Sequence, residues 1–86
     1  MTNPYEAPQA RASLTLADLR VGQTGTVTQI AGTDSISARL LEMGLIPGTT
    51  VALLGKAPLG DPLEFELRGY NLSLRMTEAS RVAITL

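Results

Sequence analysis

Few residues of this 86-residue chain are of the types that perform chemistry, and none stands in a catalytic spacing. The chain contains no His, so its serines have no base to activate them, and no Cys, so neither a disulfide nor a thiolate zinc site can form. Lys56 is the one lysine, and it stands beside a Gly/Pro loop where a solvated side chain is expected. Glu64 and Glu66 share one face of a predicted strand, and two carboxylates alone hold a divalent cation weakly. We therefore predict no enzymatic activity, no metal site and no cofactor.

The charge and the composition exclude further classes of function. Seven basic residues against eight acidic ones give a net charge of -1, which lacks the basic footprint of nucleic-acid binding. Aromatic residues make up only 3%, so there is no stacking platform for single strands. No apolar run approaches the roughly 18 residues of a membrane span, and no secretory signal is apparent. The sequence predicts a small cytoplasmic domain that binds a partner.

Apolar residues at the end of a predicted helix are the best candidates for a partner surface. If Ile36 and Leu40 face the core, Leu41 points partly outward, because successive helical residues lie about 100° apart. The alternative is that these side chains plug the end of the domain. Leu59 stands at a loop tip, where it either folds back or docks into a partner. An exposed apolar patch marks a binding surface, and the predicted partner-binding residues are Arg39, Leu41, Glu42, Met43, Leu45 and Leu59.

The segment 34–43 has the pattern of one short α-helix. Asp34 or Ser35 can cap its first N–H groups. Gly44 follows its last residue, where a left-handed stop is easiest. A helix of about ten residues is marginal alone, so it must be held by an apolar face, which we predict to consist of Ile36, Leu40 and Met43.

Five further segments are strand-like and closely spaced. Alternation of apolar and polar residues is clean over 63–68, 71–75 and 81–86, and β-branched or apolar runs occupy 25–30 and 50–54. Such spacing with frequent turn signals predicts a small barrel. We expect a mainly β fold, an SH3-like, partly open β-barrel of about five strands, with the short helix covering one open end.

The connections between these segments carry Gly, Pro and Asp. We predict a tight turn at Gly69-Tyr70-Asn71 and one helical turn at 77–80, capped by Thr77. Residues 1–12 are polar and aperiodic and are predicted to form a flexible tail, which leaves 13–86 as the domain. The predicted structural turn residues are Gly44, Pro47, Gly48, Pro58, Gly60, Asp61, Pro62 and Gly69.

Two blocks of the sequence together resemble the ferrous iron transport protein A family, the FeoA domain. The resemblance covers about residues 14–86. The first block is the helix and turn from Arg39 to Gly48. The second, in order and at the family's spacing, consists of Ala57 to Leu63, Arg68-Gly69-Tyr70, Leu74-Arg75 and Glu78-Ala79.

The resemblance implies an SH3-like barrel and a role as a cytosolic accessory of FeoB, the ferrous iron transporter with a cytosolic GTPase domain. The resemblance does not settle whether such an accessory activates GTP hydrolysis or supports assembly. If it activates hydrolysis, an arginine supplied in trans is the obvious device, and Arg39 is the first candidate. Contact with the membrane is implied only through the transporter. The alternative function is a free-standing interaction barrel with another partner, related to the C-terminal domain of metal-dependent repressors. Weak self-association through a barrel edge stays open.

Overall fold

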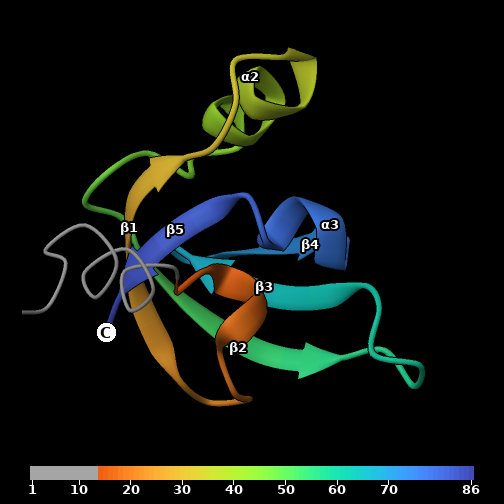
Figure 1. Cartoon of the computed structure of the whole chain (residues 1–86). Helices are drawn as coiled ribbons and strands as arrows, with labels where there is room; N and C mark the ends of the chain where they lie inside the picture. Colours follow the sequence, from red (N-terminus) through yellow and green to blue (C-terminus); the bar gives the residue numbers. More distant parts are fainter. Residues whose placement is uncertain (1–13) are drawn as a thin grey trace, which may run out of the picture.

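Five strands and three short helical segments follow one another along residues 14–86, the part of the chain that the computed structural model describes (Figure 1). The predicted tail, 1–12, lies outside these residues. The elements are η1 (Leu16–Asp18), β1 (Thr24–Ile30), α2 (Ser35–Glu42), β2 (Thr50–Lys56), β3 (Leu63–Leu67), β4 (Tyr70–Leu74), α3 (Met76–Ala79) and β5 (Val82–Thr85).

The strands form one antiparallel sheet in the order β4-β3-β2-β1-β5. The register shifts between Val27 and Gln29 against β5, and between Leu53 and Gly55 against β3. Bulges of this kind bend a strand and increase its twist, so the sheet curls around its own side chains without closing. The predicted mainly β, partly open barrel of five strands is confirmed.

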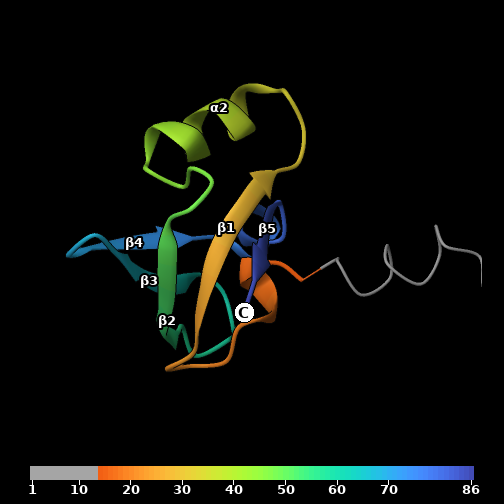
Figure 2. The same ribbon diagram turned by 90° about the vertical axis from the view of Figure 1, so that its left-hand side faces the viewer.

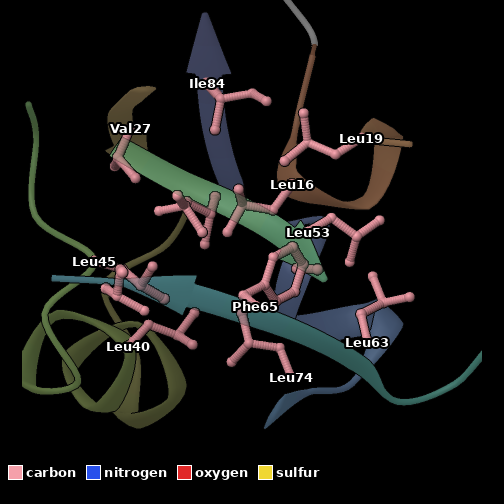
Figure 3. Close-up of a cluster of buried hydrophobic side chains, with 14 residues drawn as sticks. Leu16, Leu19, Val27, Leu40, Leu45, Leu53, Leu63, Phe65, Leu74 and Ile84 are labelled. Carbon is pink, nitrogen blue, oxygen red and sulfur yellow. The ribbon is translucent and has the colours of Figure 1, made fainter. Parts of the chain in front are cut away.

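The concave side of the sheet holds the hydrophobic core (Figure 3). The alternating side chains of β3 point into it, with Leu63, Phe65 and Leu67 essentially inaccessible. Truncation of a buried Phe or Leu costs about 2–5 kcal/mol, so these positions decide stability. The remaining core residues come from every other element: Leu16, Leu19, Val27, Leu40, Leu45, Val51, Leu53, Leu74, Ala79, Val82 and Ile84.

The helix α2 lies over one end of the curled sheet (Figure 2). Asp34 caps it, because its side chain accepts the Ser37 N–H at 3.1 Å. The predicted buried face is only partly correct. Leu40 is fully buried and Met43 packs against the core, but Ile36 is 36% exposed and Ser37 takes the buried position instead. The reason is a hydrogen bond, since the Ser37 hydroxyl donates to the carbonyl of Ala31 at 2.8 Å.

Two of the predicted connections differ in the structure. The β3–β4 turn consists of Arg68 and Gly69, with φ of 52° and 85°, as in a type I′ hairpin, so Tyr70 and Asn71 belong to β4 rather than to the turn. The one-turn helix α3 begins at Met76, not after Thr77. Its first turn is closed by Glu78, whose carboxylate accepts the N–H of Arg75 at 2.8 Å. Because this contact makes Arg75 the N-cap residue, the helix begins earlier than predicted.

Candidate interaction surface

The structure separates the predicted partner-binding residues into two groups at opposite ends of the barrel. Arg39, Leu41, Glu42 and Met43 lie at the C-terminal half of α2. Leu59 lies in the β2–β3 loop, residues 57–62, which we call the leucine loop. Both Figure 1 and Figure 2 show α2 at the top of the molecule, and the loop lies well below it, at the lower right in Figure 1 and at the bottom in Figure 2. A single flat partner surface therefore cannot cover both groups.

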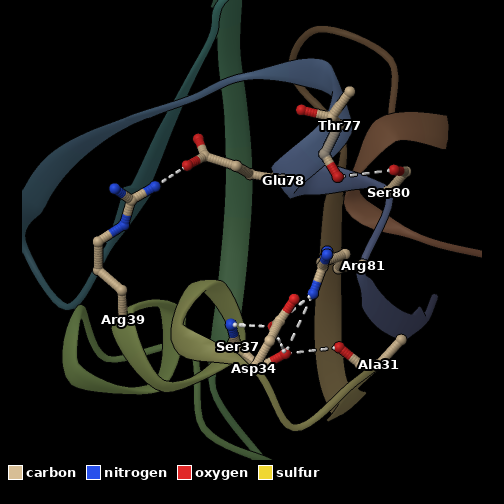
Figure 4. A network of polar contacts seen from close by, with 8 residues as sticks. All are labelled: Ala31, Asp34, Ser37, Arg39, Thr77, Glu78, Ser80 and Arg81. Atoms are coloured by element: carbon tan, nitrogen blue, oxygen red, sulfur yellow. Dashed lines mark hydrogen bonds and ion pairs between the residues drawn. The ribbon is translucent and has the colours of Figure 1, made fainter.

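Arg39 is both exposed and anchored. Its guanidinium forms an ion pair with Glu78 of α3 (Figure 4), while its side chain remains 54% exposed and that of Glu78 is 15% exposed. Because the Glu78 carboxylate also closes the first turn of α3, the pair connects the middle of α2 to the β4–β5 connection. The arginine is therefore presented in a fixed place on the surface.

Leu41 and Met43 do not form one patch. Two helical residues that are two apart differ by about 200° in direction, so these side chains leave the helix on opposite sides. Leu41 is 44% exposed, whereas Met43 is partly buried against the core. The exposed apolar side chains at this end are Ile36, Leu41 and Ile46, of which sequence reasoning placed Ile36 inside.

Leu45 is part of the core rather than of the surface. Its side chain is fully buried and its N–H donates to the carbonyl of Leu40 at 3.2 Å. The expectation that Leu45 touches a partner is therefore wrong. The turn that buries it depends on Gly44, which has a φ of +104°, and a Cβ at this position would lie 2.5 Å from the Tyr70 hydroxyl.

Three residues that are distant in the sequence hold α2 against the rest of the domain by polar contacts. The Tyr70 hydroxyl donates to the carbonyl of Met43 at the end of the helix, and Arg39 binds Glu78 at its middle. At its start, Nη1 of Arg81 donates to Asp34 at 2.7 Å (Figure 4). These long-range partners, Tyr70, Glu78 and Arg81, carry no sequence signal that pairs them with the helix.

The Asp34–Arg81 contact also sets the charge state of the carboxyl group. The hydrogen bond from Arg81, followed by the one from the N–H of Ser37, lowers the pKa of Asp34 from 3.8 to about 2. The two residues line a shallow hollow of about 340 Å³ together with 31–33. Because the anion and the cation at this hollow already satisfy each other, it offers no free charge for a ligand.

The leucine loop presents Leu59 almost completely to solvent, with 96% of the side chain exposed. The predicted turn residues all lie between helices and strands. They are Gly44, Pro47 and Gly48 after α2, Pro58, Gly60, Asp61 and Pro62 in the leucine loop, and Gly69 in the β3–β4 hairpin.

Between residues 14 and 86, no three acidic, His or Cys side chains come together as a metal cluster. Glu64 of β3 is engaged with the Ser73 hydroxyl of β4. No helix in the same range has the length and apolar character of a membrane span.

Comparison with known proteins identifies the family. The model of the FeoA domain matches residues 14–86. A curated relative from Porphyromonas gingivalis, the Fe(2+) transport protein A/Fe(2+) transporter FeoB fusion protein, is 32% identical over 71 residues. The match covers 83% of this chain but only 8% of the fusion protein, so this chain spans a small part of that relative's length.

Solved structures agree with the family match. A FeoA-like protein from Clostridium acetobutylicum superposes with a TM-score of 0.80 at 33% identity, covering 85% of each chain. FeoA from Stenotrophomonas maltophilia, complexed with zinc and described as a prokaryotic SH3 domain protein, gives 0.73 at 31% identity over 83% of this chain and 88% of its own. IdeR from T. acidophilum shares the fold alone, with a TM-score of 0.73 at 22% identity over 85% of this chain and 33% of its own.

Proposed function

Because the chain belongs to the FeoA domain family, we propose that it is an accessory protein of ferrous iron uptake that binds the cytosolic GTPase region of a FeoB-type transporter. The observation that carries this proposal is the Porphyromonas gingivalis relative, in which a matching segment and FeoB form one fusion protein. Covalent connection converts a binding event into an intramolecular one at high effective concentration. Two domains that are joined in one protein and separate in another are good candidates for a direct contact.

We place this contact at the C-terminal half of α2, on the residues Arg39, Leu41 and Glu42, which we call the helix surface. Met43 is not part of it, because its side chain packs against the core. Leu41 supplies apolar area that is 44% exposed, and the acidic Glu42 lies between it and the basic Arg39 around the helix. The three polar contacts that hold α2 fix the helix that carries these side chains before a partner arrives. A fixed surface loses little conformational entropy on binding, which supports a direct role in recognition.

Arg39 has to leave Glu78 before it can reach a phosphate group. A GTPase-activating arginine must enter the active site of its partner in trans, so activation would exchange the ion pair with Glu78 for contact with the nucleotide. We therefore assign Arg39 a docking role first. Stimulation of hydrolysis by this chain, and its loss in Arg39→Ala, would add the catalytic role.

The test is a titration of the labelled full chain into the purified cytosolic domain of FeoB, with and without GTP, following both binding and hydrolysis. Leu41→Asp should weaken binding by about tenfold or more, because it places a charge in an apolar contact. Leu54→Asp is the matched control, since Leu54 is 45% exposed but lies on β2.

Each outcome of this titration has a definite meaning. Faster hydrolysis on binding would make the chain an activator, and binding at an unchanged rate would make it an assembly or gating factor. Absence of binding at tens of micromolar, or equal weakening by the two aspartate variants, would contradict the proposed contact.

A further inference from the structure

Leu59 has no role in the fold of this domain. Its side chain is 96% exposed, more than that of any other large hydrophobic residue among the described residues. Each of the other strongly exposed apolar residues is at most 69% exposed. Leaving a leucine in water forgoes about 1.5–3 kcal/mol of burial, which a partner that covers Leu59 would recover.

The loop around Leu59 is held in one shape by hydrogen bonds. The N–H of Gly60 donates to the carbonyl of Ala57 at 2.7 Å, which closes a turn with Leu59 near its tip. The N–H of Ala57 donates to the carbonyl of Pro62 at 3.0 Å, which closes the base of the loop. Asp61 accepts the N–H of Met76 at 2.9 Å, which ties the loop to the start of α3. The leucine is therefore presented on a braced loop.

Local turn chemistry does not explain a leucine at this position. In a turn from Ala57 to Gly60, Pro58 and Gly60 occupy the second and fourth positions, where a type I turn favours them, and Leu59 occupies the third position, where such a turn accepts most residues. A polar residue there would keep the same backbone and remove the exposed apolar surface. Local structure thus requires Pro58 and Gly60 but not the leucine between them.

Building on the proposed function, we infer that the leucine loop is a second and independent docking element, which inserts Leu59 into an apolar pocket of the transporter's cytosolic part. The immediate neighbours of Leu59 are Pro58 and Gly60, which carry no charge, so the recognising pocket has to be apolar and narrow. Since the loop and the helix surface lie at opposite ends of the barrel (Figure 1), the partner must contact both ends, and the barrel acts as a rigid spacer between two contacts.

Two contacts on one rigid body reinforce each other. Once the first contact forms, the second becomes intramolecular, and the combined affinity can exceed either single affinity by about 10²–10⁴-fold when the geometry permits both. The braced loop adds to this effect, because little further ordering is needed on binding. The inference predicts that each contact contributes separately to affinity.

The test uses the full chain and the purified cytosolic domain of FeoB, with affinities measured for the wild type, Leu59→Asp, Leu59→Ala, Leu41→Asp and the Leu41→Asp/Leu59→Asp double variant. Leu59→Asp should weaken binding by about tenfold or more, and Leu59→Ala by less. The melting temperature of Leu59→Asp should equal that of the wild type, because the Leu59 side chain makes no core contact. Val21→Asp, at a 59% exposed residue of a different turn, is the control and should change affinity by less than about twofold.

The outcomes separate this inference from the proposed function. An unchanged affinity in Leu59→Asp together with a loss in Leu41→Asp would overturn the inference and leave the helix surface in place. The reverse pattern would support the leucine loop and overturn the helix surface. Equal losses in Val21→Asp and Leu59→Asp would mean a broad apolar surface and would overturn the inference. If the wild type does not bind at all, both fail together; if Leu59→Asp melts early, Leu59→Ala decides.

Discussion

The helix surface and the leucine loop present apolar side chains by opposite structural means. The partners that hold α2 lie far away in sequence: Met43 contacts Tyr70, Arg39 contacts Glu78 and Asp34 contacts Arg81. The leucine loop is closed mainly by its own backbone, with the Asp61–Met76 contact as its one bond to a distant element among the residues described. The helix surface therefore depends on the whole fold, whereas the shape of the leucine loop is determined locally.

The two ends should differ most in their response to Gly→Ala. An alanine at position 44 must adopt a φ of +104°, and its Cβ would lie 2.5 Å from the Tyr70 hydroxyl and displace it. A Cβ at Gly60, by contrast, meets nothing within 4 Å. Positive φ alone costs an alanine about 1–2 kcal/mol, and loss of the Tyr70 bond adds about 1 kcal/mol. We expect Gly44→Ala to lower the free energy of unfolding by about 2–3 kcal/mol and Gly60→Ala by about 1–2 kcal/mol, measured by urea denaturation.

Equal losses of stability in Gly44→Ala and Gly60→Ala would contradict this difference between the two ends. They would show that Tyr70 moves aside freely and that the end of α2 is not fixed by it. A second readout is affinity for the transporter domain, where Gly44→Ala should act through the position of the helix surface and Gly60→Ala through that of Leu59.

A smaller effect is expected from two variants that each remove one hydrogen bond, one at the end of α2 and one at the leucine loop. Tyr70→Phe removes the donor to the carbonyl of Met43, and Asp61→Ala removes the acceptor for the N–H of Met76. Each should cost about 0.5–1.5 kcal/mol, toward the low end because both side chains are exposed. Hydrogen exchange separates them: Tyr70→Phe should speed exchange of the Leu45 amide and leave that of Gly60 unchanged, and Asp61→Ala should do the reverse. If either variant speeds exchange at both amides, the two ends are coupled.

The same contrast explains what the sequence could reveal. The strands, the barrel class and the start of α2 rest on alternation and capping, which are local signals, and they were predicted within a few residues. Ile36 was placed in the core, where the structure has Ser37 instead, because periodicity alone does not register the Ala31 carbonyl that satisfies the serine. Leu45 was placed on the surface, because nothing local shows that the turn after Gly44 folds its side chain inward. The Arg81 and Tyr70 contacts depend on which strands become neighbours and had no signal at all.

A smaller effect should come from pH, and only at the helix end. The pKa of Asp34 is lowered to about 2 by the hydrogen bonds from Arg81 and Ser37, against 3.8 without them. A carboxyl group whose pKa is lower in the folded than in the unfolded state stabilises the folded state at any pH above its unfolded-state pKa. This contribution is lost as the pH falls through the folded-state pKa. The difference in melting temperature between the wild type and Asp34→Asn should therefore be constant above about pH 5 and shrink between about pH 4 and pH 2. A difference that does not change over this range would mean that the ion pair contributes nothing.

The smallest expected effect is that of divalent metal, and it bears on the alternative function as a barrel that reads metal status. A ligand that binds only the native state stabilises it by RT ln(1 + [L]/Kd), about 0.4 kcal/mol when its concentration equals Kd. For a domain of this size that amounts to a rise in Tm of about 2–3 °C. We expect no such rise with millimolar ferrous or manganous ion, because the chain has neither His nor Cys and its described carboxylates do not cluster. A metal-dependent rise in Tm that disappears in Glu64→Gln would place the metal on β3 and β4, away from both the helix surface and the leucine loop. It would favour a metal-reading role over a role that depends only on partner binding at these two sites.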